Sequence, residues 1–181
     1  MPVNKIHAAI QFAALAHGQQ KRKGTEIPYL VHPFEVAQLL TAEGAPEELI
    51  LAGLLHDTLE DAHIAPEQIE EEFGRAVALL VLSASEDKTK SWEERKAHTV
   101  EYLQRDAPYE ALLLACADKL SNLRSIAADH ESEGEAVWDR FRRGRAQQRW
   151  YYAGLLRAFA PLQDTGMYQE FCVLFEEVFG C

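Results

Sequence analysis

The 181-residue sequence contains few of the residues that build β-sheets or disulfide frameworks. Valine, isoleucine and threonine, which favour strands, number only 9, 7 and 6, whereas alanine, leucine and glutamate number 26, 22 and 21. The three cysteines, at positions 116, 172 and 181, are odd in number and far apart, without the CxxC spacing of a zinc or redox site. We therefore predict an all-α protein that works in the reducing cytoplasm.

Long apolar runs and basic residues are also scarce. No stretch of 18 apolar residues occurs, and the N-terminus lacks the basic and apolar segments of a signal peptide. The 18 basic residues face 29 acidic ones, so the net charge of −11 repels nucleic acid and acidic membranes. Although Arg140–Arg149 contains five arginines, no nucleic-acid-binding motif accompanies them. We predict neither a nucleic-acid nor a membrane partner, and nothing indicates an oligomeric state.

Signatures of several large enzyme classes are missing as well. The sequence contains no GxxxxGK phosphate loop, no GxGxxG turn, no GxSxG elbow and no HExxH helix. P-loop, Rossmann, serine-hydrolase and zincin chemistry are thereby excluded. The length fits one domain that spans residues 1–181 and is large enough to bury a core.

Apolar residues at helical spacing, bounded by glycine and proline, predict the order of the helices. Pro33 should begin a helix that runs from Phe34 to Ala42, and Pro46 another that continues to about Asp61. The other expected helices cover residues 5–16, 66–73, 76–82, 92–104, 109–128, 136–141, 146–160 and 168–179. Residues 83–91 are polar and should form an exposed loop.

Charged side chains interrupt the most apolar of these helices. The run LILAGLL leads directly into His56 and Asp57, and Glu60 and Asp61 follow one turn later on the same expected helix. A buried carboxylate is costly unless it is paired or bound to a cation, so these acids need a counter-charge inside the fold. Imidazole with carboxylate is a common ligand pair for a divalent ion, and an acid one turn away could deprotonate its water.

Two further polar signals occur in apolar surroundings. Asp118, Asn122 and Ser125 lie at positions i, i+4 and i+7 of the segment LLLACADKLSNLRS, so they form one polar stripe on a greasy helix. His32 precedes Pro33 at the head of another apolar helix. Each signal alone is weak, because a lone histidine in an apolar setting is more often a hydrogen-bonded core residue.

Together, the order YxxHP, HDxxED and ADKxxN resembles the HD-domain metal-dependent phosphohydrolases, and within them the hydrolase domain of the RelA/SpoT alarmone enzymes. The similar segments are residues 28–37, 51–80, 115–125 and 141–155. The resemblance implies a single HD-type helical bundle that hydrolyses a nucleotide with the help of one divalent ion.

Carried over by position, the resemblance also implies roles for individual residues. The implied metal ligands are His32, His56, Asp57 and Asp118. The acids that activate water would be Glu60 and Asp61, and the implied nucleotide contacts are Arg22, Lys23 and Asn122. We expect Lys119 to help neutralise phosphate charge. Two nitrogen and two oxygen ligands suit Mn²⁺, our first choice, and also Fe²⁺, Zn²⁺, Co²⁺ or Mg²⁺.

The sequence departs from the alarmone hydrolases at three places. Leu82–Lys88 stands where those enzymes read close to DGVTK, Ala62 stands where a threonine is expected, and Ser121 occupies a position that is often histidine. The first candidate substrate is guanosine 3′,5′-bis(diphosphate), cleaved at its 3′-pyrophosphate. The alternatives are a phosphatase for another nucleotide, such as a nucleoside 5′-phosphate or NADPH, and a non-catalytic nucleotide-sensing module. The intact Glu60–Asp61 pair argues against the sensing module.

Overall fold

The chain folds into a succession of helices, as its composition predicts. In the computed structural model, which describes residues 4–62 and 64–180, no strand forms among the described residues beyond one isolated bridge between Lys21 and Pro28. The elements in chain order are α1 (Lys5–His17), α2 (Val31–Ala42), α3 (Glu47–Leu55), α4 (Thr58–Asp61), α5 (Pro66–Phe73), α6 (Arg75–Ala84), α7 (Trp92–Arg105), α8 (Tyr109–Glu133), the 3₁₀ helix η1 (Gly134–Arg140), α9 (Gly144–Ala158), the 3₁₀ helix η2 (Ala160–Leu162) and α10 (Gly166–Phe179). The all-α prediction is confirmed.

Local capping explains where several helices begin and end. The Asn4 side chain accepts hydrogen bonds from the first turn of α1, and Gly18, with φ of +49°, ends that helix. Ser91 and Glu94 form a reciprocal capping box at the start of α7. Because these signals are local, the sequence predicts such boundaries to within a residue or two.

The helix that we expected to run from Pro46 to about Asp61 is divided, so that prediction is wrong. α3 ends at Leu55, a turn follows, and α4 starts at Thr58. Side chains compete with the helix for its carbonyls there: Thr58 donates to the Leu55 carbonyl at 2.7 Å, and His56 Nδ1 lies 2.8 Å from the Gly53 oxygen. Because of this turn, Asp57 and Glu60 do not lie on the one continuous helix that we had expected.

Four smaller expectations also need correction. α2 begins at Val31, so His32 lies within its first turn, and α8 continues to Glu133. The segment expected to be a helix at 136–141 is the 3₁₀ helix η1. Residues 83–91 are not simply an exposed loop, because α6 extends to Ala84 and the Glu86 side chain is only 11% exposed.

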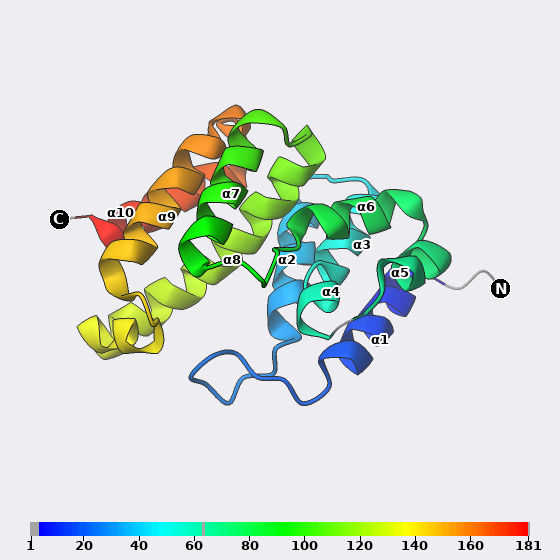
Figure 1. The fold of residues 1–181 in the computed structure, drawn as a ribbon, viewed down its shortest axis with the longest axis horizontal. Helices are drawn as coiled ribbons and strands as arrows, with labels where there is room; N and C mark the ends of the chain where they lie inside the picture. Colours follow the sequence, from blue (N-terminus) through cyan, green and yellow to red (C-terminus); the bar gives the residue numbers. More distant parts are fainter. Residues whose placement is uncertain (1–3, 63, 181) are drawn as a thin grey trace.

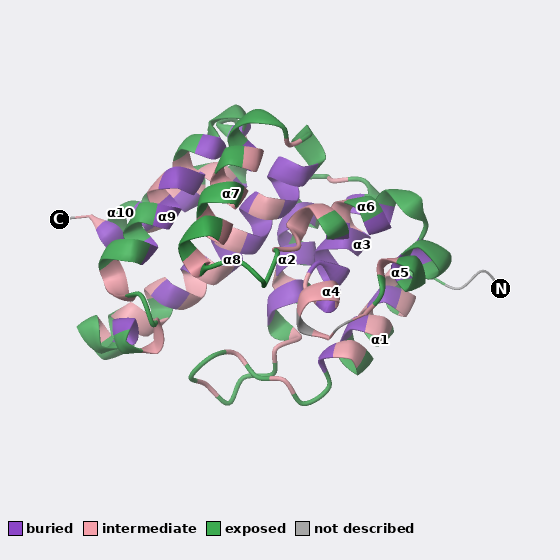
Figure 2. Cartoon of the chain, viewed as in Figure 1, coloured by how far each residue is buried: buried purple, intermediate pink, exposed green. Residues whose placement is uncertain are grey.

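The core lies where α2, α3 and α8 meet. α2 packs against α3 and α8, α1 and α6 pack on α3, and α10 packs along the far part of α8 (Figure 1). Buried side chains follow these central helices, whereas the connector between α1 and α2 is largely exposed (Figure 2). Chain segments far apart in sequence are thus brought to one interior. Among the described helices, none combines the length and apolar character needed to cross a bilayer.

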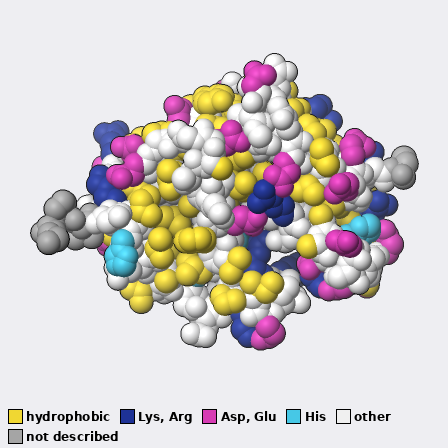
Figure 3. All heavy atoms as spheres, turned by 180° about the vertical axis from the view of Figure 1, so that it is seen from behind, with side chains coloured by type: hydrophobic (Ala, Val, Ile, Leu, Met, Phe, Trp, Pro, Cys, Tyr) yellow, Lys and Arg dark blue, Asp and Glu magenta, His cyan; other side chains and the backbone are white. Residues whose placement is uncertain are grey.

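The arginines of Arg140–Arg149 are largely engaged within the fold. Arg145 and Arg149 donate to the carbonyls of Val178 and Phe179 at the end of α10, where a helix has unpaired carbonyls. Arg143 pairs with a glutamate of α7 at 2.8 Å. On the face shown in Figure 3, basic side chains lie scattered among acidic and hydrophobic ones. Arg143, Arg145 and Arg149 thus have partners within the fold.

A core substitution in α10 should weaken the whole domain. Phe171 is fully buried, and its ring centroid lies 5.4 Å from that of Phe159. Phe171→Ala should lower the free energy of unfolding by about 3–5 kcal/mol, because it removes apolar contacts and leaves a cavity. In a denaturant titration of this variant, α2 and α10 should still unfold together in one transition. Selective loss of α10 structure at low denaturant would show instead that the two halves unfold separately.

Candidate metal and nucleotide site

Four side chains from three separate segments meet where α2, the turn after α3 and α8 come together. His32 comes from the first turn of α2, His56 and Asp57 from the turn after α3, and Asp118 from the middle of α8. One ligand atom each of His32, His56 and Asp118 lies within 4.8 Å of the others. Asp57 Oδ2 is 3.0 Å from His56 Nε2 and 3.5 Å from His32 Nε2. The atoms of His32, His56 and Asp118 are close enough to share one small cation, and Asp57 lies beside both imidazoles.

The imidazole of His56 fits such a cation particularly well. Its Nδ1 is directed at the Gly53 carbonyl, while its buried Nε2 has no aligned hydrogen-bond partner among the described residues, although Asp57 Oδ2 is near. A buried nitrogen with a carboxylate beside it but no aligned hydrogen bond is well placed to serve as a metal ligand. The two imidazoles and the Asp118 carboxylate form a donor set typical of a divalent ion, with the Asp57 carboxylate next to both rings.

The electrostatics of the cluster favour a positive charge between the two acids. Burial opposes charge on His56, but the carboxylates of Asp57 and Asp118 outweigh it and raise the pKa of His56 to about 9. Burial lowers the pKa of His32, against the attraction of Asp118. Burial also opposes charge on Asp57, yet the neighbouring imidazoles, chiefly that of His56, hold its pKa below the ordinary range. A cation held by His56 would have to take the place of the His56 proton.

Neighbouring groups hold both acids in place. The Tyr29 hydroxyl donates to Asp57 Oδ2 at 2.7 Å. Asp118 accepts from Asn122 Nδ2 at 2.7 Å and from Lys119 Nζ at 2.6 Å. Despite its burial, the pKa of Lys119 is raised well above its usual value, because Asp118 stabilises the charged form. The structure thus places Lys119 and Asn122, predicted substrate contacts, directly on a predicted metal ligand.

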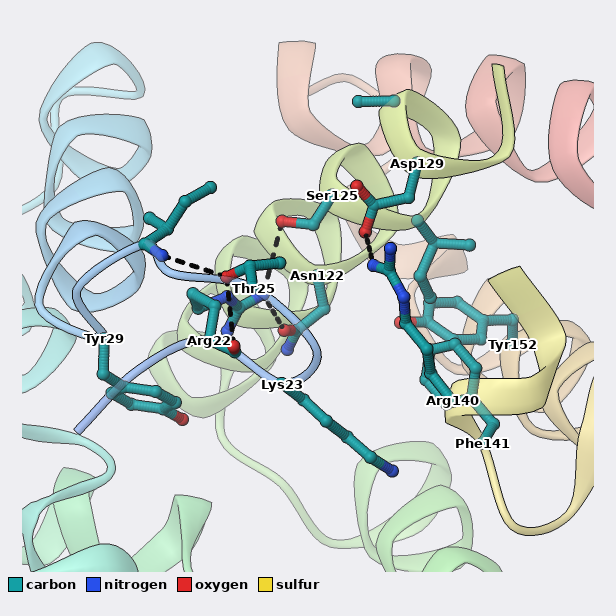
Figure 4. Close-up of a pocket in the computed structure, with 13 residues that line it drawn as sticks. Arg22, Lys23, Thr25, Tyr29, Asn122, Ser125, Asp129, Arg140, Phe141 and Tyr152 are labelled. Carbon is teal, nitrogen blue, oxygen red and sulfur yellow. Dashed lines mark hydrogen bonds and ion pairs between the residues drawn. The ribbon is translucent and has the colours of Figure 1, made fainter. Parts of the chain in front are cut away.

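A cavity of about 460 Å³ adjoins the cluster through Tyr29 and Asn122 (Figure 4). Arg22 reaches across it from the α1–α2 connector and donates to Asn122 at 2.9 Å and to Ser125 at 3.3 Å. The volume lies within the range of small-molecule sites. The predicted contacts Arg22 and Asn122 therefore lie together in its wall.

The far side of this cavity is aromatic and basic. Lys23 extends along the opening, with its ammonium 5.4 Å from the Phe141 ring centroid (Figure 4). Arg140 and Tyr152 complete this side, and Arg140 is neutralised by Asp129 and Glu133. Lys23 has no acidic partner among the described residues, so its charge is available to an anion.

A second cavity, of about 660 Å³, reaches the cluster from the other side, where Asp118 and Lys119 form part of its wall. Glu86 lies in this wall and binds Arg95, Lys96 and Thr99 at 2.9, 2.8 and 3.1 Å. Burial opposes charge on Glu86, but Lys96 outweighs it and lowers the pKa of Glu86. The segment that departs from the DGVTK pattern is therefore tied firmly to α7.

Glu60, a predicted acid for water activation, lies in α4 just after the cluster. Its side chain is 24% exposed, and its Oε1 lies 3.5 Å from Lys88 Nζ, which also donates to the Glu60 carbonyl at 2.8 Å. The side chain of Asp61, the second predicted acid, lies outside the part of the structure that is described.

Sequence reasoning missed several participants. Tyr29 stands in the YxxHP motif, and that motif could have indicated its contact with Asp57. Lys88 lies in the segment that departs from the DGVTK pattern, and it donates to the Glu60 carbonyl. Phe141, which follows α8 and η1, lines the cavity. No local pattern in the sequence could have assigned either residue to the site.

The sequence is similar to known proteins over most of its length. Residues 9–146 match the HD domain family. The mouse guanosine-3′,5′-bis(diphosphate) 3′-pyrophosphohydrolase is 42% identical over 121 residues, which cover 65% of this chain and 67% of the mouse protein. A Listeria monocytogenes crystal structure is 40% identical and superposes with a TM-score of 0.78, over 83% of this chain and 99% of its own. The structure of a metazoan SpoT ortholog that hydrolyses ppGpp is 28% identical, with a TM-score of 0.84 over 100% and 99% of the two chains.

Proposed function

Because the chain belongs to the HD-domain family, we propose that it is a metal-dependent phosphohydrolase that removes the 3′-pyrophosphate of guanosine 3′,5′-bis(diphosphate), ppGpp. The observation that carries the proposal is the meeting of His32, His56 and Asp118 beside a nucleotide-sized cavity. Relatives with this named activity, at up to 42% identity, support the choice of substrate.

The proposed metal ligands are His32, His56, Asp57 and Asp118, and Mn²⁺ is our first choice, with Fe²⁺, Zn²⁺, Co²⁺ and Mg²⁺ as alternatives. When bound, such an ion would lower the pKa of water and polarise a phosphoryl oxygen. The residues of the chain would orient the metal ligands. Tyr29 and Asn122 keep Asp57 and Asp118 oriented through their hydrogen bonds.

In the proposed reaction, water attacks the phosphorus that is bonded to the ribose 3′-oxygen. The bond from this phosphorus to the 3′-oxygen then breaks. Glu60, with Asp61, takes a proton from the attacking water. The 3′-oxygen leaves with the electron pair and takes up a proton, so the products are GDP and pyrophosphate. Lys88, whose Nζ lies 3.5 Å from Glu60 Oε1 and donates to the Glu60 carbonyl, would restrain that carboxylate.

The cavity of Figure 4 is the proposed nucleoside site. A base could stack on the guanidinium of Arg22, which already lies 5.7 Å from the Tyr29 ring centroid, or on the ring of Phe141. Lys23 faces the opening and would neutralise phosphate. Lys119 stays a predicted phosphate contact, reached from the second cavity.

We further propose that residues 1–181 form one domain. A single apolar cluster joins Ala9 of α1 to Phe179 of α10. The cysteine pattern and the nucleotide substrate favour the cytoplasm. Small-molecule substrates are the only partners that we propose.

A substrate panel tests the assignment. Manganese-loaded protein should hydrolyse ppGpp with a kcat/KM at least about 100-fold above those for NADPH and a nucleoside 5′-phosphate, because only ppGpp offers a 3′-pyrophosphate. Preference for NADPH or the 5′-phosphate would make the protein a phosphatase for another nucleotide. Binding of ppGpp without turnover, with every metal tried, would instead support the sensing module.

Arg22 should matter for substrate binding more than for turnover. Arg22→Ala should raise KM for ppGpp about 10-fold or more, because it removes a charge-assisted contact worth about 1.5–3 kcal/mol. Steady-state kinetics measure the change. Lys21→Ala is the matched control, since Lys21 pairs with Glu26 on the exposed side of the same connector. If both variants show the wild-type KM, the connector does not bind the nucleotide.

A further inference from the structure

The ring nitrogen of His32 that faces away from the metal cluster starts a chain of hydrogen bonds that ends on α10. Nδ1 of His32 lies 2.8 Å from Ser121 Oγ, and that hydroxyl donates to Glu35 Oε2 at 2.7 Å. Arg124 Nη1 donates to the other Glu35 oxygen at 2.8 Å. The same guanidinium binds both oxygens of Glu170 at 2.6 and 2.7 Å. The chain thus joins α2, α8 and α10.

The direction of these hydrogen bonds is determined by counting protons. A carboxylate can only accept hydrogen bonds, and a serine hydroxyl has one proton to donate. Ser121 therefore donates its proton to Glu35. Its oxygen must then accept from His32, which places the ring proton on Nδ1. In the opposite tautomer, Nε2–H would face Asp118 Oδ1 at 3.2 Å, and a lone pair of Ser121 would face Glu35 at 2.7 Å. In that arrangement the Ser121 oxygen and the Glu35 carboxylate face each other as two acceptors with no proton between them, which is unfavourable.

We propose that Glu35 is a positioning residue for the metal site: through Ser121 it holds the His32 proton on Nδ1 and leaves the Nε2 lone pair free for the ion. This inference rests on the metal site of the proposed function. Arg124, clamped by Glu170, presents Glu35 to Ser121 in this geometry. The metal ligand is thereby coupled to a helix that begins at Gly166, beyond the residues that match the HD domain family.

Burial strengthens the inner end of this chain of hydrogen bonds, whereas the side chains of Glu35 and Arg124 are 27% and 36% exposed. The side chain of His32 and the residue Ser121 are each only 1% exposed, so water cannot replace the hydroxyl bridge. In such a dry setting the orientation of a hydrogen bond carries more energy than at the surface. The paired contacts of Arg124 with Glu170 add geometric restraint, because a planar guanidinium meets a carboxylate in one plane.

Glu35→Gln tests the inference with almost no change of shape. Arg124 donates to the side chain at this position, so it should draw the amide oxygen and turn the amide NH₂ toward Ser121. The hydroxyl is then free to donate to His32, and the ring proton should move to Nε2. We expect Mn²⁺ affinity, measured by chelator competition, to fall about 10-fold or more. The ¹⁵N shifts of the His32 ring in metal-free protein should report the new tautomer.

Glu43→Gln is the matched control. Glu43 also ties α2 to α10, by accepting from the Met167 N–H at 2.8 Å, but its contact is not with His32 or Ser121. We expect this variant to keep the wild-type tautomer and metal affinity, even if its stability falls. Equal losses of affinity in both variants would mean that any loosening of α2 against α10 suffices, which would overturn the proposal.

A double-mutant cycle supplies a second test that does not depend on Glu35→Gln alone. Ser121→Ala removes the bridge, so it should itself weaken metal binding, and adding Glu35→Gln should then cost nothing more. Additive effects, or a wild-type His32 proton on Nε2, would overturn the proposal. If the wild-type protein bound no divalent ion, the proposed function would fail instead, while the ¹⁵N shifts would still decide the role of Glu35.

Discussion

Glu60→Gln should slow ppGpp hydrolysis about 100-fold or more while the protein keeps its metal ion. The amide has nearly the shape of the carboxylate but cannot take a proton from water, and general-base catalysis is typically worth about 10²–10⁴-fold. Stopped assays of pyrophosphate release measure kcat, and elemental analysis measures bound metal. We expect the same result for Asp61→Asn, the second predicted acid of the HDxxED motif.

Glu70→Gln, in an exposed position of α5, is the control for the loss of one glutamate charge and should behave as wild type. Loss of metal from Glu60→Gln would contradict the division of roles, because it would make Glu60 a ligand. Full activity with full metal content would remove Glu60 from the chemistry altogether.

His56→Ala should lose both metal and activity. The substitution removes a buried Nε2 that lies 3.0 and 3.8 Å from oxygens of Asp57 and Asp118, and it leaves those two acids without the imidazole that faces them. We expect Mn²⁺ affinity to fall by more than the factor of about 10–100 that loss of an outer-shell partner costs. Turnover should then be undetectable at metal concentrations that saturate wild type.

His7→Ala, on the exposed side of α1, is the matched control and should keep both properties. Circular dichroism of each variant separates a lost site from a lost fold. A folded His56→Ala protein that binds Mn²⁺ as tightly as wild type would place the metal elsewhere.

The sequence predicts the fold class and most helix boundaries because their causes are local. The cap at Asn4 and the capping box at Ser91 lie within one turn of the helix ends that they define. The break after Leu55 escaped prediction because it depends on how Thr58 and His56 use their side chains against the backbone. Apolar periodicity carries no sign of that competition.

The candidate site was predictable in part for a similar reason. His32, His56 and Asp118 each interrupt an apolar stretch, so the sequence itself marks them as buried polar groups that need partners. The hydrogen bonds from Ser121 to Glu35 and from Arg124 to Glu170 join residues 86 and 46 positions apart. Only the tertiary fold brings such pairs together, and their residue types are ordinary for helix surfaces.

One titration tests the central claim most directly. Metal-free protein is given increasing Mn²⁺ and then ppGpp, and bound metal, GDP, pyrophosphate and phosphate are measured in each sample. The proposed function predicts that activity rises with bound metal, reaches its maximum at about one ion per chain, and yields GDP and pyrophosphate in equal amounts. Hydrolysis that persists without metal, or release of single phosphates in place of pyrophosphate, would contradict it.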